Sequence, residues 1–204
     1  MTIFGAGRVG TALARALVAS RYDVRIVGSG PANGIELIVN VLAPGAVPMD
    51  ANPAVADADV VILAVPLHKL DTIDAELLTG KIVVDVMNYW EPIDGALPEF
   101  QHLNTITSRV ISRHLAAASV VKAFNHIGYH DIETDRREPG DPDRRALAVA
   151  GDDHAAVALV MEMVHRIGFD AVNAGGLDES GILEAGGPVF GARLTRHTLK
   201  QHLS

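Results

Sequence analysis

A glycine motif near the start of the chain constrains the fold more than any other feature of the sequence. Gly5-Ala6-Gly7-Arg8-Val9-Gly10 follows a short apolar segment, residues 2–4, and precedes an apolar segment rich in small residues, 11–18. In a G-x-G-x-x-G between strand and helix, the three glycines serve the tight turn, the approach of a pyrophosphate and the helix–strand packing. A second strand at 23–27 completes a βαβ unit. The motif therefore predicts a dinucleotide-binding turn with phosphates at the helix N-terminus.

The rest of the chain alternates short apolar segments with helix-like segments. Strands are expected at 45–48, 60–65, 81–86, 119–124, 146–150 and 170–173. Helices are expected at 36–42, 52–58 (capped by Asn52), 67–78, 108–115 (capped by Ser108) and 154–167, with a final helix of about three turns ending near residue 202. Residues 135–143 are interpreted as a solvated loop.

This alternation predicts an α/β fold, a Rossmann-type, doubly wound, mostly parallel sheet with a small C-terminal helical annex. Two parts are expected. Residues 1–150 form an NAD(P)-binding Rossmann domain, and residues 151–204 form a small C-terminal α/β segment that completes the fold and the pocket for a partner ring.

Composition excludes several classes of protein. The chain has 17 Lys and Arg against 25 Asp and Glu, a net charge of −8, so it offers no basic surface for nucleic acid. It has no cysteine, which excludes disulfides and thiolate chemistry. No apolar segment approaches the length of a membrane span, and we expect a cytoplasmic protein without a membrane partner.

Ligands of open parallel sheets bind beyond the carboxyl ends of the strands. At the end of the second strand, where an acidic residue would bind the ribose of NAD, the chain has Gly28 followed by Ser29. Nothing there repels a 2′-phosphate, and the Ser29 hydroxyl offers a donor. Lys122 interrupts an apolar strand, so we expect it either to contact a phosphate or substrate or to protect an edge strand.

No metal site is predicted. His126 and His130 are four residues apart, but Gly128 between them breaks a helix and no third ligand is evident. The serines stand in no nucleophile-elbow pattern, so hydrolysis has no support.

Taken together, these segments resemble the family of NADPH-dependent coenzyme F420 reductases, small enzymes that pass hydride between NADP and a deazaflavin. The similar segments are the glycine motif, Gly28-Ser29, Leu63-Ala64-Val65-Pro66, Asp85-Val86-Met87-Asn88, Val120-Val121-Lys122-Ala123-Phe124-Asn125, Gly187-Pro188 and Ala192-Arg193. The Lys-Ala-Phe-Asn run and the Gly-Pro-x-x-x-Ala-Arg tail are more specific than the glycine motif.

The resemblance implies roles for particular residues. Gly5, Ala6, Gly7, Arg8, Val9 and Gly10 would bind the cofactor, with Gly7 to Gly10 at the pyrophosphate. Ser29 would bind the adenosine ribose or its phosphate, and Ala64, Val65 and Pro66 the nicotinamide half. Asn88, Asn125 and His126 are candidates for orienting the nicotinamide or the partner ring, and no residue receives a firm catalytic role. NADP is the implied cofactor, F420 a possible co-substrate, and a homodimer the implied assembly, with the apolar segment after Gly186 as a candidate partner surface.

The sequence departs from the family pattern at three places. Gly30 stands where an arginine usually clamps the 2′-phosphate, so NAD is not excluded. Tyr89-Trp90-Glu91-Pro92 follows Asn88 where proline is usual, and His126 replaces a common threonine. The alternatives are therefore a dinucleotide-binding redox sensor without turnover, or an NADPH-dependent reductase of another small substrate with His126, Tyr89 or Tyr129 as proton donor.

Overall fold

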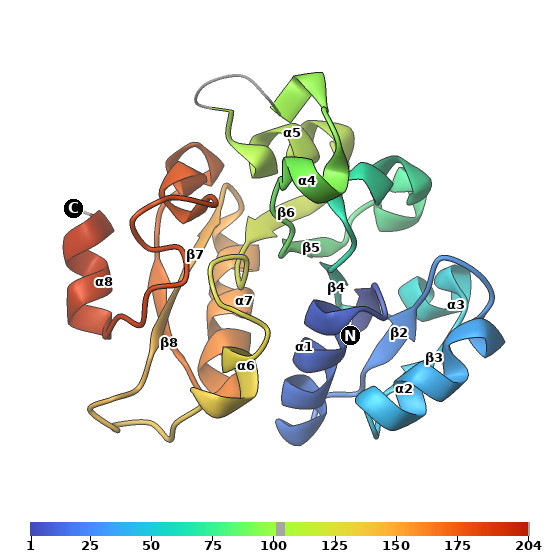
Figure 1. Ribbon diagram of the computed structural model, residues 1–204, viewed down its shortest axis with the longest axis horizontal. Helices are drawn as coiled ribbons and strands as arrows, with labels where there is room; N and C mark the ends of the chain where they lie inside the picture. Colours follow the sequence, from blue (N-terminus) through green and yellow to red (C-terminus); the bar gives the residue numbers. More distant parts are fainter. Residues whose placement is uncertain (101–104, 204) are drawn as a thin grey trace.

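The chain folds around one β-sheet (Figure 1). The computed structural model describes residues 1–100 and 105–203, and these form an eight-stranded sheet in the order β3-β2-β1-β4-β5-β6-β7-β8. Neighbouring strands are parallel except β6 and β7. The strands are β1 (Thr2–Phe4), β2 (Arg25–Val27), β3 (Val47–Pro48), β4 (Val60–Leu63), β5 (Ile82–Asp85), β6 (Ser119–Lys122), β7 (Ala146–Gly151) and β8 (Asp170–Asn173).

The order of the first six strands is that of a Rossmann fold, which confirms the predicted fold class. The last two strands continue the same sheet beyond β6. The predicted boundary after residue 150 falls inside β7, and the division into two domains stays a prediction.

Helices connect the strands and cover both faces. The α-helices are α1 (Arg8–Ala19), α2 (Glu36–Leu42), α3 (Ala51–Ala56), α4 (Glu91–Asp94), α5 (Thr107–His114), α6 (Asp131–Thr134), α7 (His154–Ile167) and α8 (Arg196–Leu203). The 3₁₀ helices are η1 (Ala32–Ile35), η2 (Leu67–Thr72), η3 (Ala75–Leu78), η4 (Pro98–Phe100) and η5 (Leu177–Leu183). No helix among the described residues is long and apolar enough to cross a membrane.

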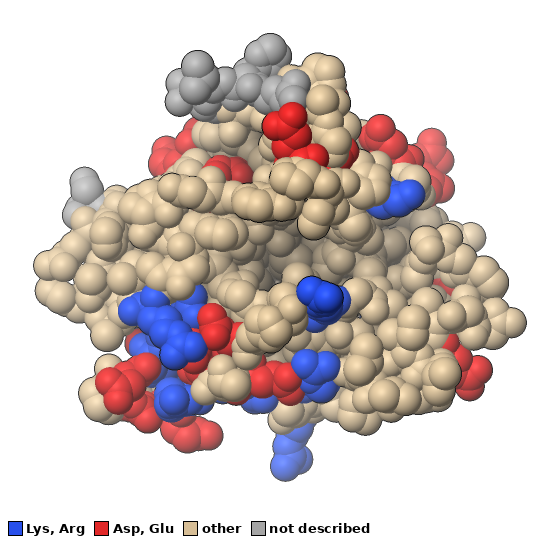
Figure 2. All heavy atoms as spheres, viewed as in Figure 1, with Lys and Arg blue, Asp and Glu red and all other residues tan. Residues whose placement is uncertain are grey.

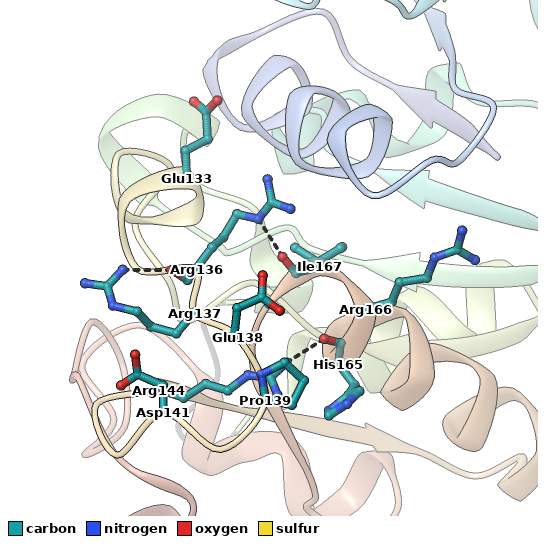
Figure 3. Close-up of a pocket in the computed structure, with 11 residues that line it drawn as sticks. Glu133, Arg136, Arg137, Glu138, Pro139, Asp141, Arg144, His165, Arg166 and Ile167 are labelled. Carbon is teal, nitrogen blue, oxygen red and sulfur yellow. Dashed lines mark hydrogen bonds between the residues drawn. The ribbon is translucent and has the colours of Figure 1, made fainter.

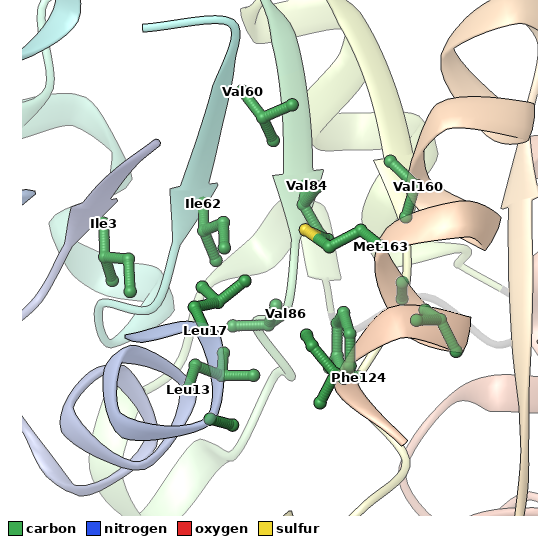
Figure 4. Close-up of a cluster of buried hydrophobic side chains, with 14 of the residues drawn as sticks. Ile3, Leu13, Leu17, Val60, Ile62, Val84, Val86, Phe124, Val160 and Met163 are labelled. Carbon is green, nitrogen blue, oxygen red and sulfur yellow. The ribbon is translucent and has the colours of Figure 1, made fainter. Parts of the chain in front are cut away.

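Two cores lie on opposite faces of the sheet because successive strand residues point to opposite sides. Ile3, Ile62 and Val84 pack on one face against α1 and α7, as Figure 4 shows with Leu17 and Met163. Their strand neighbours pack on the other face with α3, α5, η2 and η3. A third, smaller cluster joins β7 and β8 to α8. Both faces of the central strands are therefore covered.

Several predicted elements have the bounds that the sequence indicated, namely α2, α7 and β8. The predicted helical segment at 67–78 is helical but divided, since it forms the two 3₁₀ helices η2 and η3. Leu67, Leu70 and Ile73 are buried at a spacing of three, which suits three residues per turn. Asp74 then caps η3 by accepting from the Glu76 amide at 2.9 Å.

The two predicted N-cap residues, Asn52 and Ser108, were wrong. Asp50 is the N-cap residue of α3, so Asn52 lies inside the helix. Ser108 lies inside α5, where its hydroxyl donates to Asp85 at 2.6 Å. The final helix, α8, has eight residues rather than three turns.

The loop at 135–143 is only partly solvated. Asp135 is buried and pairs with Arg145 at 2.8 Å, so it anchors the start of this segment.

Candidate functional site

Gly5 and Gly10 are the positions of the motif where the fold itself requires glycine. Gly5 has a φ of +118°, and a Cβ atom there would lie 2.3 Å from the Ala64 carbonyl oxygen. A Cβ atom on Gly10 would lie 1.9 Å from the Gly5 carbonyl oxygen. At Gly7, by contrast, nothing lies within 4 Å of the Cβ position. Two glycines therefore close the turn, and Gly7 borders open space.

The first turn of α1 faces that space without a side-chain cap. Gly7 is the N-cap residue in an extended conformation, and the first turn contains no acidic residue. The first amides of a helix have no partner within it and lie at its positive end. The amides at Arg8, Val9 and Gly10 are therefore suited to an anionic group.

A cavity of about 560 Å³ lies beyond the carboxyl ends of β1, β2 and β4. Figure 2 shows this face of the molecule hollowed between α1 and the segment that carries α4. Among the predicted site residues, the cavity is lined by Gly5, Ala6, Gly7, Ser29, Ala64, Val65 and Pro66. The strand ends thus bring together segments that lie 60 residues apart in the sequence.

The cavity also contains a lysine that the sequence analysis missed. Lys69, on η2, lines it together with Ser29 and Gly30. Within residues 1–100 and 105–203, Lys69 forms no ion pair. Its place could have been found from the sequence, because it follows the end of β4 by six residues. Asp74, the acidic lining residue, already accepts from an amide with its Oδ1.

A second cavity of about 260 Å³ begins at Val9, in the first turn of α1. Its walls come from the loops after β5 and β6 and from the segment before α8. The lining residues are Val9, Val86, Asn88, Phe124, Asn125, His126, Ile127, Gly128, Tyr129, Asp131, Phe190 and Gly191. Arg8 extends over this region, because its Nη1 donates to the Tyr129 hydroxyl at 3.3 Å.

Asn88 and Asn125, both predicted site residues, hold each other in this cavity. The Asn88 side-chain amide donates to the Asn125 carbonyl at 2.8 Å, and the Asn125 amide donates to Asn88 Oδ1 at 3.1 Å. Asn125 also donates to the Leu183 carbonyl at 2.6 Å. The Asn125 side-chain amide is thereby used within the protein, whereas Asn88 is partly buried and keeps one N–H free for a ligand.

His126 is buried and cannot supply a proton to a substrate. Its Nε2 accepts from the Ala148 amide at 3.1 Å, so the proton of the neutral ring is on Nδ1 and donates to Asn125 Oδ1 at 3.1 Å. Burial, aided by Arg145 and Lys122, lowers the pKa of His126 to about 3. In the folded chain the His126 ring therefore contacts Asn125 and the Ala148 amide, and its predicted role in orienting the nicotinamide stays a prediction.

Phe124, just before these residues, has a φ of +59°, an unusual backbone conformation for a bulky residue. It turns the chain at the end of β6 so that Asn125 and His126 reach the second cavity. This conformation was not foreseen from the sequence.

Lys122 contradicts both interpretations made from the sequence, because it lies fully buried in a central strand and reaches neither cavity. Its ammonium group pairs with the buried Asp85 at 3.0 Å and donates to the Met87 carbonyl at 2.6 Å. Asp85 also accepts from the Met87 amide at 2.9 Å and from Ser108. This network fixes the backbone immediately before Asn88.

A third cavity, of about 550 Å³, lies between the segment after α6 and the end of α7 (Figure 3). Its arginines are used by the fold: Arg136 donates to the Ile167 carbonyl at 2.5 Å and Arg144 to the His165 carbonyl at 2.6 Å. They cap the negative end of α7, which does not favour an anionic ligand. No group of three or more metal-ligating side chains occurs among the described residues.

Comparison with known proteins supports a dinucleotide-dependent enzyme. Residues 1–89 match the model of the family "NADP oxidoreductase coenzyme F420-dependent". Among curated protein sequences, none matches the chain. A hypothetical protein of Sinorhizobium meliloti has 28% identity and a TM-score of 0.79, covering 96% of this chain and 94% of that one.

A second structure, assigned as an F420-dependent NADP reductase from an Arthrobacter species, has 25% identity and a TM-score of 0.72. The alignment covers 89% of this chain and 88% of that one. The resemblance to the F420-dependent NADP oxidoreductases is thereby confirmed, with the family model itself covering residues 1–89.

A more distant structure shows the fold alone. The reductive aminase from Aspergillus terreus, in complex with NADPH, has 16% identity and a TM-score of 0.61. It covers 89% of this chain but only 57% of its own length. These findings support an NADP-dependent oxidoreductase and leave its acceptor open.

Proposed function

We propose that this protein transfers hydride between NADP(H) and a flavin-like ring, with the deazaflavin F420 as the acceptor tested first. The observation that carries the proposal is the presence of two cavities beside the start of α1, one lined by its N-cap residue Gly7 and the other by Val9 in its first turn. One has the open turn and free amides that suit a dinucleotide, and the other offers an adjacent place for a second ring.

The residues present fit a dinucleotide. Gly7 leaves the space that a phosphate needs, and the amides of α1 would donate to the pyrophosphate. Ala64, Val65 and Pro66 would border the nicotinamide half, and Ser29 the adenosine ribose. When bound, NADPH supplies the hydride, and the protein's part is to position the two rings and exclude water.

Lys69 could supply the positive charge that the 2′-phosphate of NADP needs. Gly30 has no side chain to clamp a 2′-phosphate, but Lys69 lines the same cavity and has no carboxylate partner among the described residues. A charged donor of this kind supports preference for NADP over NAD, worth about 1.5–3 kcal/mol.

The chemistry of the second cavity favours a flavin-like acceptor. His126 is held neutral with both ring nitrogens engaged, so it offers no proton. Tyr89 does not line the cavity, and its hydroxyl donates to the Gly95 carbonyl at 3.0 Å. Hydride transfer between two rings needs no side-chain acid, which fits these surroundings.

Tyr129 supports a second candidate function, reduction of a carbonyl or imine. It lines the second cavity, and Arg8 donates to its hydroxyl, which leaves the phenolic proton for a substrate. The third possibility, a redox sensor without turnover, would use the first cavity alone.

The experiment is anaerobic mixing of the protein and NADPH with oxidised F420, and separately with free flavin, while the acceptor absorbance is recorded. Loss of the F420 absorbance, with Tyr129→Phe retaining most of the rate, is the expected result. Binding of NADPH without loss of either absorbance would refute the flavin-like acceptor. A panel of ketones and cyclic imines then tests the second candidate, for which Tyr129→Phe should lose at least about tenfold.

A further inference from the structure

The second α-helix, α2, carries apolar side chains that no other described part of the chain covers. α2 has the sequence Glu-Leu-Ile-Val-Asn-Val-Leu, and of these residues only Val39 is buried. Leu37 is 77% exposed and Val41 65% exposed, one helical turn apart. Ile38 and Leu42 form a second row beside them, at 41% and 47% exposure. The apolar side of a helix normally packs against another part of a protein.

The apolar surface continues onto the edge of the sheet. β3 is the outermost strand and packs against α2, and its Val47 is 50% exposed. We call the five side chains Leu37, Ile38, Val41, Leu42 and Val47 the α2 face. Most of the large exposed hydrophobic side chains among the described residues belong to it. From their exposed fractions, the α2 face presents on the order of 500 Å² of apolar surface, a size that marks interaction sites.

The edge strand β3 offers no free amides for pairing with a strand of another chain. Val47 and Met49 donate their amides inward, to the Val24 and Ile26 carbonyls of the β2 side, at 2.9 and 3.0 Å. Pro48, between them, has no amide hydrogen to direct outward. Proline at this position is a common protection of sheet edges. A partner would therefore contact side chains of the α2 face rather than extend the sheet.

The α2 helix is held firmly enough to serve as a contact surface. Its last carbonyl, at Leu42, accepts from Arg15 of α1, and Arg15 is itself paired with Glu133 at 2.6 Å. Val39 packs into the main core with Ala43 and Ala46. The face is thus presented on a rigid support, which lowers the entropy lost on association.

We propose that the α2 face is the contact between two copies of this chain. Two such faces in contact would bury about 1,000 Å², which approaches the area of a specific protein–protein contact. A two-fold contact uses one surface twice, so a self-complementary apolar face needs no charged groups for recognition. The face has none, since Glu36 is the sole charged residue of α2.

A membrane is a poorer partner for this surface. Interfacial helices carry lysines and arginines on their polar side, whereas α2 has none and the chain has a net charge of −8. The apolar segment after Gly186, which the sequence suggested as a partner surface, is partly covered by its own chain: Val189 and Leu199 are buried on β7 and β8. The proposed dimer contact therefore lies at the β3 end of the sheet, opposite the predicted contact at the β8 end.

The first measurement is sedimentation velocity of the cofactor-free protein between 1 and 100 µM. The expected mass rises towards twice the 21.6 kDa of one chain, that is about 43 kDa. Val41→Glu and Leu37→Glu should remain at the mass of one chain with unchanged circular dichroism, because both side chains are exposed. Their melting temperature should no longer rise with protein concentration, whereas that of the wild type should. The matched control, Ile93→Glu on α4, replaces a residue of equal exposure, 65%, and should leave the dimer intact.

A second measurement uses the absence of cysteine from the chain. Val41→Cys should give a covalent dimer on mild oxidation, and Ile93→Cys should not. A wild-type chain that stays at 21.6 kDa at 100 µM would overturn the proposal. Sedimentation of that monomer with anionic lipid vesicles would then indicate a membrane as the partner of the α2 face. A dimer that survives Val41→Glu would overturn the proposal as well. Neither measurement requires cofactor or turnover, so the outcome is independent of the proposed function.

Discussion

Replacing Lys122 with methionine tests the buried network beneath Asn88. The substitution keeps the length of the side chain and removes its charge. Asp85, which has no exposed surface, would then be left as a carboxylate without its cation, although it would keep the donors Met87 N–H and Ser108. The Met87 carbonyl would lose its donor at the same time.

The expected cost follows from the burial of both charges. Removing one partner of a buried ion pair costs about 3–5 kcal/mol, because the remaining charge is uncompensated. For a domain of about 200 residues this corresponds to a fall of roughly 10 °C in melting temperature. The loss is a large part of a typical free energy of unfolding of about 5–15 kcal/mol.

The assay is urea unfolding followed by circular dichroism, with the exposed Lys200→Met as the control for loss of one positive charge. The double variant Lys122→Met with Asp85→Asn should recover about 2 kcal/mol, since the amide removes the charge and keeps an acceptor for Met87 N–H. A free energy of unfolding of Lys122→Met within about 0.5 kcal/mol of the wild-type value would show that the buried ion pair does not stabilise the fold.

Four further variants test the glycine turn, Lys69 and His126. Gly10→Ala should lose at least about 3 kcal/mol of stability, because its Cβ would meet the Gly5 carbonyl, whereas Gly7→Ala should unfold at the wild-type urea concentration. Lys69→Met should weaken NADPH binding by at least about tenfold in a fluorescence titration and leave NADH binding unchanged; equal losses for both nucleotides would contradict the assignment. In the folded state the His126 ring takes up its second proton only near pH 3, whereas in the unfolded chain it does so near pH 6.5. The contribution of His126 to the free energy of unfolding is therefore full above pH 6.5 and falls as the pH drops towards 3. Between pH 7.5 and 5.0 the wild type should lose about 2 kcal/mol more than His126→Gln, measured by urea unfolding at each pH, and equal pH dependence would contradict the buried neutral state.

The parts of the fold that depend on local pattern could be predicted from the sequence. The glycine motif, the buried strand β4 and the helix α7 with its Asp153 cap follow from residues within a few positions of one another. The strand ends then locate the first cavity, because parallel strands place their carboxyl ends at one edge.

Features that depend on distant pairs could not be predicted. Lys122 meets Asp85 across 37 positions, and no local pattern distinguishes that pair from a lysine at an edge strand or a ligand site. The role of His126 depends on the Ala148 amide from β7, which lies next to β6 only in the folded sheet. The exposure of the α2 face is likewise a property of tertiary packing, since its apolar spacing alone indicates a buried helix.

The most direct test of the account is equilibrium titration of the purified chain with NADPH, followed by nicotinamide fluorescence, beside a Gly7→Val variant. We predict one saturable site per chain in the wild type. We also predict that Gly7→Val keeps its circular dichroism and melting temperature but loses NADPH binding, because its side chain fills the open space at the turn. A folded wild-type chain that binds neither NADPH nor NADH, or a Gly7→Val variant that binds NADPH as the wild type does, would contradict the assignment of the glycine turn as the cofactor site.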